Sequence, residues 1–561
     1  MSVIETRCLS SLAKVFADEE PQEQPFLRAS ALENETFAYQ IAYRLSGNPR
    51  SLRHVRVRVE SELRERITVR SVGLAPSELP CYGDHDEHVL RTQPGLYPDP
   101  LYPISPTEGI IVPPDQWRSL WITVALDGSR PAGAYPIALV LESESGEPLA
   151  KCAFELDVLP AQLPEQKLIH TEWFHTDCIA QYYGVDVFSE AHWSLVERFV
   201  LTAVDHGVNM LLTPLFTPPL DTKAGGERPT VQLVDVIKDG SRYAFGFDRL
   251  RRWVEMCDRT GIKYLEFSHL FTQWGAKHAP KIMATEDGRL KRIFGWDTDA
   301  AGEAYGQFLA QFLPALVAFV KDSGLEGRCW FHVSDEPALE HLASYSAAAA
   351  ILHRHVGEFP IVDALSRVEF YKNGLVRKPI PATDHIEPFL AEGIDGLWTY
   401  YCCSQYKDVS NRFFNQPSAR NRIIGIQLYK YGIEGFLHWG YNFWFSQYSV
   451  RPINPFVTTD ADHAFPSGDA FLVYPGADGP IESIRMEVLF EALQDLRALE
   501  LLESLVGRDE VIRLIEELAG EELTFSSYPR NAEWLLAFRE EVNRRIVDAL
   551  RPESLPQVQR S

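Results

Sequence analysis

Two acidic residues stand side by side in this sequence, Asp335 and Glu336, after the apolar run CWFHVS and before Pro337. Because like charges repel, one carboxyl group of such a pair has a raised pKa and keeps a proton near neutral pH. A protonated carboxyl group beside an ionised one suits general acid–base catalysis, and paired carboxylates are typical of glycoside hydrolysis. The pair is therefore the first candidate for chemistry in this chain.

The local sequence allows two interpretations of the pair. Side chains of a strand alternate between its faces, so both acids reach one pocket only if the strand bends at Glu336. Pro337 favours such a bend, because it disfavours helical geometry in the residue before it and cannot donate to a ladder. The same residues also fit a helix start, with an acid capping the segment 338–355. One acid could cap while the other acts on a substrate.

Adjacent acids fit one mechanism of glycoside hydrolysis better than the usual one. The usual retaining scheme needs a nucleophile and an acid on separate elements about 5 Å apart, yet the apolar run 396–402 ends without Asp or Glu. Glu172 and Glu266 are available elsewhere, although Glu266 lies inside a predicted strand and has the position of a satisfied wall residue. In substrate-assisted hydrolysis, the acetamido oxygen of the substrate is the nucleophile, one acid orients the acetamido nitrogen, and the other protonates the leaving oxygen.

The elements that must position these acids form a repeating pattern. Short apolar runs alternate with amphipathic segments, which indicates βα units and a (β/α)8 barrel whose active face lies at the carboxyl ends of the strands. A doubly wound open sheet is the alternative, but no GxGxxG or Walker A motif supports a nucleotide site. The predicted strands are 168–174, 208–214, 263–269, 329–335, 360–365, 382–388, 396–402 and 435–441.

The flanking regions differ from the barrel in their periodicity. Residues before about 160 alternate strictly between apolar and polar in short runs such as SLWITVAL, which predicts an antiparallel β-sandwich. Residues after 480 have helical spacing, and the first of these helices stops at Gly507. We therefore predict a multidomain α/β protein with an N-terminal antiparallel β-sandwich (1–160), a central (β/α)8 TIM-like barrel (166–480) and C-terminal helices packed on the barrel (481–561).

Aromatic and polar residues gather at the predicted strand ends and suggest a floor for a sugar, with packing at the barrel mouth as the alternative. The rigid segment PGLYPDPLYP of the sandwich adds two candidates, with interdomain packing as the alternative. The predicted substrate-binding residues are Trp173, His175, Tyr400, Trp439, Tyr441, Asn442, Trp444, Tyr97 and Asp99.

The sequence predicts no metal ion and no cofactor. The segment GDHDEH (83–88) concentrates possible ligands, but they are consecutive, which favours a solvated loop. His175, His269 and His438 lie near strand ends, but the first predicted strand lacks the HxH spacing of metal-dependent barrels. No GxSxG motif indicates an esterase.

Composition limits the partners. The chain of 561 residues carries a formal net charge of -24, which opposes binding to nucleic acid and to anionic membrane surfaces. No segment has the pattern of a signal peptide or a membrane span, and the eight cysteines show no framework spacing. We expect a cytoplasmic protein with a carbohydrate substrate and no nucleic-acid or membrane partner; homo-oligomerisation is left open.

Four motifs in order along the chain resemble one known group. RTQPGLYPDPL, HVSDEP, LHWGYNFW and SIRMEVLFEALQDL are similar to the DUF4091 proteins, which are related to glycoside hydrolase family 123, the β-N-acetylgalactosaminidases. The resemblance implies a β-sandwich, a (β/α)8 barrel and a substrate-assisted retaining mechanism. It also implies that Asp335 stays charged and orients the acetamido group, and that Glu336 is the general acid/base. The family mostly acts on secreted or surface glycans, whereas this sequence shows no export signal.

The expected function is that of a retaining exo-glycoside hydrolase that acts on terminal β-linked 2-acetamido sugars such as N-acetylgalactosaminides. One alternative is a glycosidase for a sugar without the acetamido group, with a separate nucleophile such as Glu172. The other is a non-catalytic carbohydrate-binding protein in which the acids only cap a helix.

Overall fold

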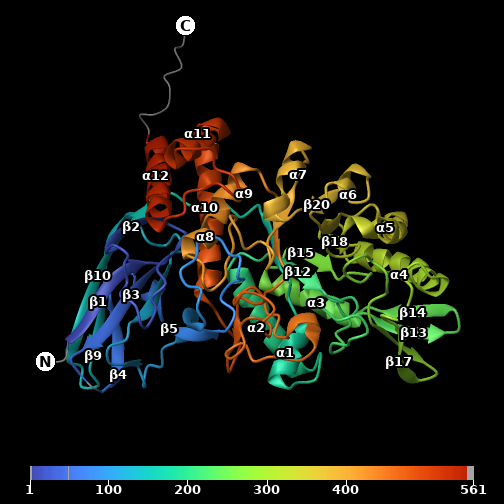
Figure 1. Ribbon diagram of the computed structural model, residues 1–561, viewed down its shortest axis with the longest axis horizontal. Coiled ribbons are helices and arrows are strands. Elements are labelled where there is room, and N and C mark those ends of the chain that lie inside the picture. Colours follow the sequence, from blue (N-terminus) through green and yellow to red (C-terminus); the bar gives the residue numbers. More distant parts are fainter. Residues whose placement is uncertain (1–2, 49, 552–561) are drawn as a thin grey trace, which may run out of the picture. The chain divides into compact units, whose positions relative to one another are not determined.

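The structure is a computed structural model that describes residues 3–48 and 50–551 (Figure 1). Its residues group into two units by their contacts. We call them the sandwich unit, which comprises residues up to 166, residues 407–431 and residues from 481, and the barrel unit, which comprises residues 167–406 and 432–480.

The sandwich unit contains two five-stranded sheets. All pairings in them are antiparallel except that of β2 with β10, which is parallel. Leu120, Ile122 and Val124 of β8 are buried in the core, as their alternation predicts. In sheet order, the strands are β1 (Val3–Ser10), β3 (Thr36–Ser46), β8 (Arg118–Ala125), β5 (Ile67–Ser77) and β6 (Gly95–Pro103), and then β2 (Arg28–Leu32), β10 (Pro148–Leu159), β9 (Gly133–Glu142), β4 (Leu52–Glu60) and β7 (Ile110–Val112).

Helix α10 is the centre of the helical part of the sandwich unit and packs against α8, α9, α11 and α12 (Figure 1). The Ser483 side chain caps its start by accepting from the Met486 amide, and Gly507, with a φ of 88°, follows its last residue. The helices are α8 (Ser418–Arg422), α9 (Ile424–Lys430), α10 (Ile484–Val506), α11 (Arg508–Ala519) and α12 (Ala532–Leu550).

This grouping differs from the three consecutive segments that the sequence predicts. The C-terminal helices group with the sandwich, and so do residues 407–431, which the prediction places inside the barrel. Buried ion pairs join these parts of the chain: Arg539 of α12 contacts Glu35 and Asp495, and Arg422 of α8 also contacts Asp495. None of these side chains differs from a surface residue in the sequence pattern, so the grouping could not be predicted.

The barrel unit contains eight parallel strands, as predicted. The first and last strands of the sheet approach each other through a parallel bridge between Ala382 and Tyr400, in which the Tyr400 amide donates to the Pro381 carbonyl (3.1 Å). The strand order is β20 (Lys378–Ile380), β19 (Ile361–Ala364), β18 (Cys329–His332), β15 (Tyr264–Phe267), β12 (Met210–Thr213), β11 (Ile169–Glu172), β22 (Gly435–His438) and β21 (Trp398–Tyr400).

The prediction of the sixth strand at residues 382–388 is wrong. The strand at this place is β20, four residues earlier, and Thr383–His385 is a turn of 3₁₀ helix followed by α7 (Glu387–Ala391). Pro379 and Pro381 flank Ile380 in the strand region and interrupt the apolar run that would identify it. The prolines are tolerated because this strand lies at the end of the sheet order, where few amides need a partner.

Helices follow most barrel strands, and one small sheet interrupts the pattern. The helices are α1 (Thr176–Tyr183), α2 (Glu190–Asp205), α3 (Asp248–Thr260), α4 (Glu303–Asp322), α5 (Leu342–Val356) and α6 (Glu369–Lys372). The sheet comprises β14 (Arg242–Gly246), β13 (Asp235–Asp239), β16 (Ile282–Glu286) and β17 (Arg289–Phe294), and the sequence analysis does not predict it. Among described helices, α4 has the length and composition to cross a membrane, but it buries Tyr305, Phe308 and Phe312 as a core helix does.

Candidate active site

A cavity of about 220 Å³ lies at the carboxyl ends of the barrel strands. Its walls come from residues that end or follow seven of the eight strands, the arrangement expected for the active face of a barrel. The lining residues are Trp173, Leu220, Asp221, Gln273, Trp274, Asp335, Glu336, Ala364, Tyr400, Cys402, Cys403, Leu437, Trp439, Gln447, Tyr448 and Phe465.

Asp335 and Glu336 both line this cavity, and both are half-buried. The backbone of Glu336 has a φ of 43°, in the left-handed region that a side chain other than glycine rarely adopts. Two hydrogen bonds hold this conformation: the Glu336 amide donates to the Ala364 carbonyl (3.0 Å), and the Trp274 amide donates to the Asp335 carbonyl (2.9 Å). The bend before Pro337 thus turns adjacent side chains toward one space.

Neither acid caps a helix. The chain continues into a 3₁₀ turn, Leu339–His341, and then into α5. The residue before the 3₁₀ turn is Ala338, whose amide donates to Nδ1 of His341 (3.1 Å). The interpretation of the pair as a helix cap is therefore wrong, because neither the 3₁₀ turn nor α5 has a cap hydrogen bond to Asp335 or Glu336.

Burial raises the pKa of both acids, and the charge of Glu336 raises the pKa of Asp335 further. The Tyr400 hydroxyl donates to Oε1 of Glu336 (2.6 Å), which stabilises the Glu336 carboxylate and opposes the effect of burial on its pKa. The hydrogen bond from Tyr400 thus favours the charged form of Glu336 in the free protein, whereas the resemblance implies a working enzyme with its charge on Asp335.

Two buried acids orient the tryptophans of the cavity wall. The Trp173 indole N–H donates to Glu266 (2.8 Å), and the Trp439 indole N–H donates to Asp469 (3.0 Å). Glu266 also accepts hydrogen bonds from Thr171 and His332, which makes it the satisfied wall residue that its place inside a strand suggests. Both indole rings are thus fixed without a contribution from substrate.

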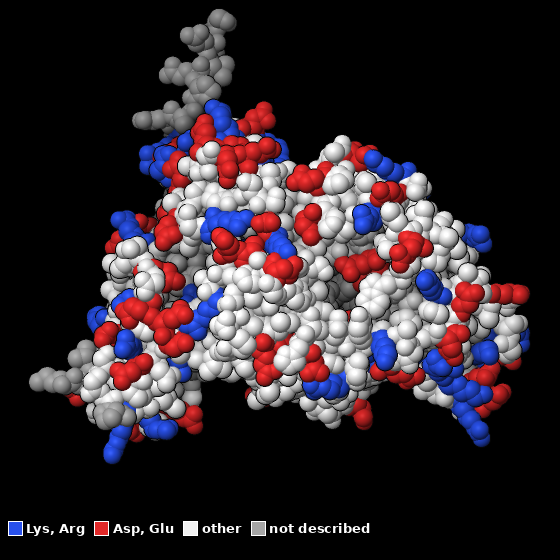
Figure 2. Space-filling model, viewed as in Figure 1, with Lys and Arg blue, Asp and Glu red and all other residues white. Residues whose placement is uncertain are grey.

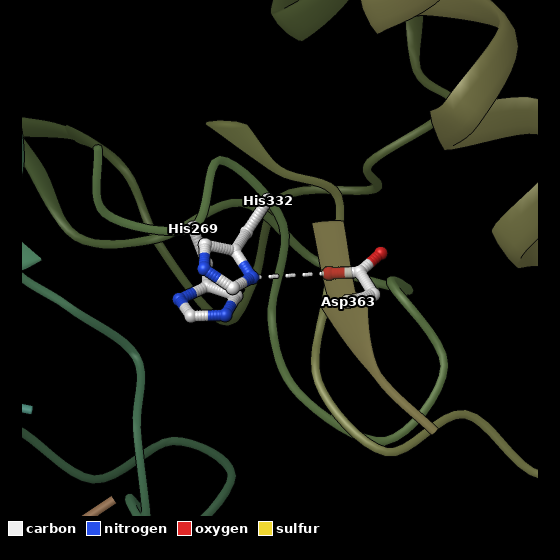
Figure 3. A group of neighbouring side chains, drawn as sticks. All are labelled: His269, His332 and Asp363. Carbon is white, nitrogen blue, oxygen red and sulfur yellow. Dashed lines mark hydrogen bonds and ion pairs between the residues drawn. The ribbon is translucent and has the colours of Figure 1, made fainter. Parts of the chain in front are cut away.

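Figure 3 shows the cluster of His269, His332 and Asp363. It lies behind this wall, because the ring of His269 contacts that of Trp173 edge-on. One potential ligand atom from each residue lies within 4.8 Å of the others, as a metal site would require. However, Nε2 of His332 lies 2.6 Å from Glu266 and Nδ1 lies 3.4 Å from Asp363. Burial lowers the pKa of His332, but these two carboxylates outweigh it and raise the pKa to about 9.

A protonated imidazole has no free lone pair for a metal ion. The Asp363 carboxylate is further engaged by the Tyr345 hydroxyl and the Ser334 amide. We therefore assign the cluster to an ion-pair network that supports the cavity wall. The GDHDEH segment is engaged in a similar way, because Asp86 pairs with Arg420 and Asp84 pairs with Lys407 within the sandwich unit.

Of the nine predicted substrate-binding residues, Trp173, Tyr400 and Trp439 line the cavity. His175, Tyr441, Asn442 and Trp444 do not line the cavity, and each is buried and hydrogen-bonded to other groups of the protein. Asn442 holds both backbone groups of His175, the Tyr441 hydroxyl donates to the Phe199 carbonyl (2.9 Å), and the Trp444 indole donates to the Val473 carbonyl (3.3 Å). The chain turns away from the cavity after Trp439, so the rest of WGYNFW packs this turn.

Tyr97 and Asp99 do not line the cavity either. The Tyr97 hydroxyl donates to the Gln93 carbonyl (2.9 Å), and Asp99 accepts two hydrogen bonds from Arg485 (2.8 and 3.0 Å). All four residues belong to the sandwich unit. The segment PGLYPDPLYP forms strand β6, and its polar side chains satisfy partners within that unit.

The alternative nucleophile, Glu172, is buried between His170 (3.2 Å) and His438 (3.7 Å) and does not line the cavity. The carboxylate that the sequence analysis missed is Asp221, which lies on the loop after β12 and lines the cavity. Burial raises the pKa of Asp221 to about 6. The other missed lining residues, such as Trp274 and Tyr448, also lie on loops, where no periodicity marks a side chain that faces a cavity.

A (β/α)8 barrel with paired carboxylates in an aromatic cavity at its strand ends is the architecture of a glycoside hydrolase. The model of the Glycoside hydrolase 123 catalytic domain matches residues 173–502, more than half of the chain, so this chain belongs to the glycoside hydrolase 123 family. The family membership predicted from the four motifs is confirmed.

One solved structure supports the fold over nearly the whole chain. A family 123 glycoside hydrolase from Clostridium perfringens, studied for its hydrolysis of glycolipid glycans, is similar over 97% of this chain and 98% of its own, with a TM-score of 0.73 and 15% identity. A β-glucuronidase from Parabacteroides merdae (TM-score 0.30, 12% identity, 89% and 52% covered) and an endo-β-1,4-mannanase from Thermotoga petrophila (0.35, 12%, 60% and 77%) are much less similar. No protein with a curated description matches the chain.

Proposed function

We propose that this protein is a retaining exo-glycoside hydrolase that removes terminal β-linked 2-acetamido sugars, such as N-acetylgalactosaminides, by substrate-assisted catalysis. The observation that carries the proposal is the position of Asp335 and Glu336, adjacent in the chain and both facing one small aromatic cavity. The end of β21 supplies Tyr400 and no carboxylate, so this strand offers no nucleophile for the usual two-carboxylate retaining mechanism.

In the first step, the acetamido oxygen of the substrate attacks the anomeric carbon as the glycosidic bond breaks. Glu336 transfers its proton to the leaving oxygen, and Asp335 stabilises the positive charge that develops on the acetamido nitrogen. In the second step, Glu336 removes a proton from water, whose oxygen attacks the anomeric carbon and opens the cyclic intermediate. The sugar leaves with its original configuration after two displacements.

This mechanism needs the proton on Glu336, whereas the hydrogen bond from Tyr400 favours the charged form of Glu336 in the free protein. An acetamido N–H that donates to Asp335 would stabilise the Asp335 carboxylate and lower its pKa. Binding of an acetamido sugar thus favours the charge on Asp335 and the proton on the general acid. A sugar without the amide lacks this donor, which would favour acetamido substrates in the chemical step as well as in binding.

The test compares aryl β-glycosides of N-acetylgalactosamine and N-acetylglucosamine that differ in leaving group. Glu336→Gln should lower kcat by about 10²- to 10⁴-fold for a poor leaving group and much less for dinitrophenolate, which needs no proton. Asp335→Asn should lower kcat for both, because its contribution does not depend on the leaving group.

Glu340→Gln is a suitable control, since Glu340 lies in the same loop with its side chain 81% exposed. Full activity of Glu336→Gln on every substrate that the wild type cleaves would overturn the proposal.

A second function is favoured by Asp221, the further carboxylate in the cavity. It could serve as a separate nucleophile on a sugar without the acetamido group, which would form a covalent glycosyl-enzyme intermediate. A 2-fluoro glycoside that labels Asp221, detected by mass spectrometry of the digested protein, would support this alternative. Substrate-assisted hydrolysis predicts inhibition by an acetamido-thiazoline and no such label.

A further inference from the structure

Two neighbouring cysteines, Cys402 and Cys403, line the cavity that holds the acid pair. Consecutive side chains of an extended chain point to opposite sides, but these two residues follow β21 in a turn. The Gln405 amide donates to the Cys402 carbonyl (3.1 Å), and Oε1 of Gln405 accepts from the Cys402 amide (3.0 Å) and thiol (3.3 Å). The turn therefore brings both thiols to one cavity, although the proposed mechanism does not use them.

The two thiols have different surroundings. Cys402 is buried, whereas Cys403 is half-buried. The hydrogen bond between the two thiols raises the pKa of Cys402, and burial and the charge of Glu336 raise it further. Cys402 therefore keeps its proton near neutral pH. Because a thiolate is the reactive form of cysteine, the first reaction must occur at the more accessible Cys403, with Cys402 as its neighbour.

Solvent reaches the cavity past Trp274 and Tyr448, which are 41% and 40% exposed. Asp221 holds this entrance in place, because its carboxylate accepts from the Tyr448 amide (2.9 Å) and its amide donates to the Gln273 side chain (2.7 Å). Among the described residues, those that line the cavity include three carboxyl groups and neither Lys nor Arg. A small uncharged reagent therefore has access, whereas size and charge oppose a large anion such as glutathione disulfide.

We propose that Cys402 and Cys403 are a modification site, at which hydrogen peroxide converts the two thiols to a disulfide and reversibly lowers the activity. The Cys403 thiolate attacks one peroxide oxygen, the O–O bond breaks, and Cys403 becomes a sulfenic acid. The hydroxide that leaves takes up the proton lost by Cys403. The Cys402 sulfur then attacks the Cys403 sulfur, so that the S–S bond forms, the S–O bond breaks, and the oxygen leaves as water with the Cys402 proton. Two thiols are oxidised, and one peroxide is reduced to two molecules of water.

The disulfide disturbs the acid pair and is readily reversed. Its ring forms in the turn that begins two residues after Tyr400, whose hydroxyl holds Glu336, and it removes the thiol that donates to Gln405. Neighbouring Cα atoms lie about 3.8 Å apart, closer than the roughly 4.4–6.8 Å of most disulfides, so this bond is strained and easily reduced by thiols. The loss of activity, though not the disulfide itself, rests on the proposed function.

The test treats the reduced protein with hydrogen peroxide and measures hydrolysis of an aryl N-acetylgalactosaminide before treatment, after it and after addition of dithiothreitol. Activity should fall by at least about 10-fold and then return, because a small displacement of catalytic groups has a large effect on rate. After alkylation and tryptic digestion, mass spectrometry should find residues 378–407, which contain these two cysteines and no other, unalkylated and two hydrogen atoms lighter than the dithiol. Glutathione disulfide at the same concentration should act far more slowly.

Cys403→Ser should lose the sensitivity to peroxide, judged by the activity of the treated variant relative to its own untreated sample. Cys152→Ser is the matched control, because Cys152 is a half-buried cysteine of the sandwich unit whose thiol contacts that of Cys8 and does not line the cavity. It should remain as sensitive as the wild type.

Equal inhibition of Cys403→Ser, inhibition that dithiothreitol does not reverse, or a disulfide in residues 378–407 with unchanged activity would overturn the inference while the proposed function stands. If the wild type cleaves no glycoside, the proposed function fails, and the mass of residues 378–407 decides alone. A disulfide that forms there with peroxide then supports the modification site, and two alkylated cysteines overturn it.

Discussion

Single residues around the cavity carry an unusual backbone conformation. Asp221, Trp274, Glu336 and Tyr448 all have a positive φ although none is glycine. Each such residue costs on the order of 1–3 kcal/mol, which the hydrogen bonds described above must offset. Hydrogen bonds from the surrounding structure therefore hold these four side chains toward the cavity. Because local sequence does not determine such a conformation, three of the four residues could not be predicted as cavity residues.

Tyr400→Phe should shift the pH dependence of activity to higher pH. The Tyr400 hydroxyl stabilises the Glu336 carboxylate, so its removal raises the pKa of the acid pair. Activity is lost as pH rises through this pKa, because the proton needed by the leaving group is then gone. The loss of a hydrogen bond to a charged group corresponds to a shift of roughly one pH unit. The measurement is the profile of kcat/KM against pH.

Tyr183→Phe provides the control, since the Tyr183 hydroxyl donates to the Gly476 carbonyl and Tyr183 does not line the cavity. Its profile should match the wild type. A shift of the Tyr400→Phe profile toward lower pH would contradict the proposed role of the hydroxyl.

Asp221→Asn should stabilise the protein above about pH 6 and not at pH 4. Burial raises the pKa of Asp221 from 3.8 to about 6, so the folded state holds this proton more tightly than the unfolded chain. Stability contributed by the protonated group is present below the unfolded pKa and is lost as pH rises through the folded pKa. Asn escapes this loss and keeps an acceptor for the Tyr448 amide, which gives a gain of up to about 3 kcal/mol.

Urea denaturation at pH 4 and at pH 7.5 measures this difference. The exposed Asp239→Asn serves as control and should change stability equally at both pH values. A gain in unfolding free energy at pH 4 that disappears at pH 7.5 would contradict the prediction for Asp221→Asn.

At the scale of helices, two glycines differ in how closely other atoms approach them. A Cβ atom at Gly425 of α9 would lie 2.0 Å from the Ala492 carbonyl oxygen of α10, whereas a Cβ atom at Gly306 of α4 meets nothing within 4 Å. We expect Gly425→Ala to cost about 1–3 kcal/mol or more of unfolding free energy, because two backbones must separate. Gly306→Ala should gain roughly 0.5–1 kcal/mol by reducing the freedom of the unfolded chain.

Urea denaturation of both variants tests this contrast. Equal effects of the two substitutions would show that the contact between α9 and α10 does not depend on the missing side chain.

At the scale of elements, apolar periodicity predicted seven of the eight barrel strands and the three C-terminal helices. It failed at β20, where Pro379 and Pro381 interrupt the apolar run, and it missed the small sheet of β13, β14, β16 and β17. The acid pair was found because its residue types are rare side by side at a strand end. The loop residues Asp221, Trp274 and Tyr448 were missed because long-range hydrogen bonds, not local sequence, direct them to the cavity.

At the scale of the whole molecule, the chain crosses between its two units at residues 166–167, 406–407, 431–432 and 480–481. On the face drawn in Figure 2, acidic and basic side chains of the described residues are interspersed. Surface charge pairs of this kind contribute little each, whereas loss of one partner of a buried pair, such as Asp99 with Arg485 or Glu35 with Arg539, leaves a buried charge without its partner and is costly.

A protease site inserted beside the exposed Glu165 tests the cohesion of the sandwich unit. After cleavage, the sandwich strands should stay bound to the rest of the chain, because Asp99, Glu35 and Lys14 have buried partners in residues 407–431 and 481–551. The cleaved protein should elute from size-exclusion chromatography at the mass of the whole chain and separate only in denaturant. Two peaks under native conditions would contradict this expectation.

The bridge between Ala382 and Tyr400 joins the first and last strands of the barrel sheet, and Tyr400 also holds Glu336 through its hydroxyl. One residue thus belongs to the seam of the barrel and to the acid pair. Local opening of the seam breaks the bond from the Tyr400 amide to the Pro381 carbonyl and releases the hydroxyl at the same moment. The hydrogen-exchange rate of the Tyr400 amide therefore measures how often, between turnovers, the hydrogen bond from Tyr400 to Glu336 is broken.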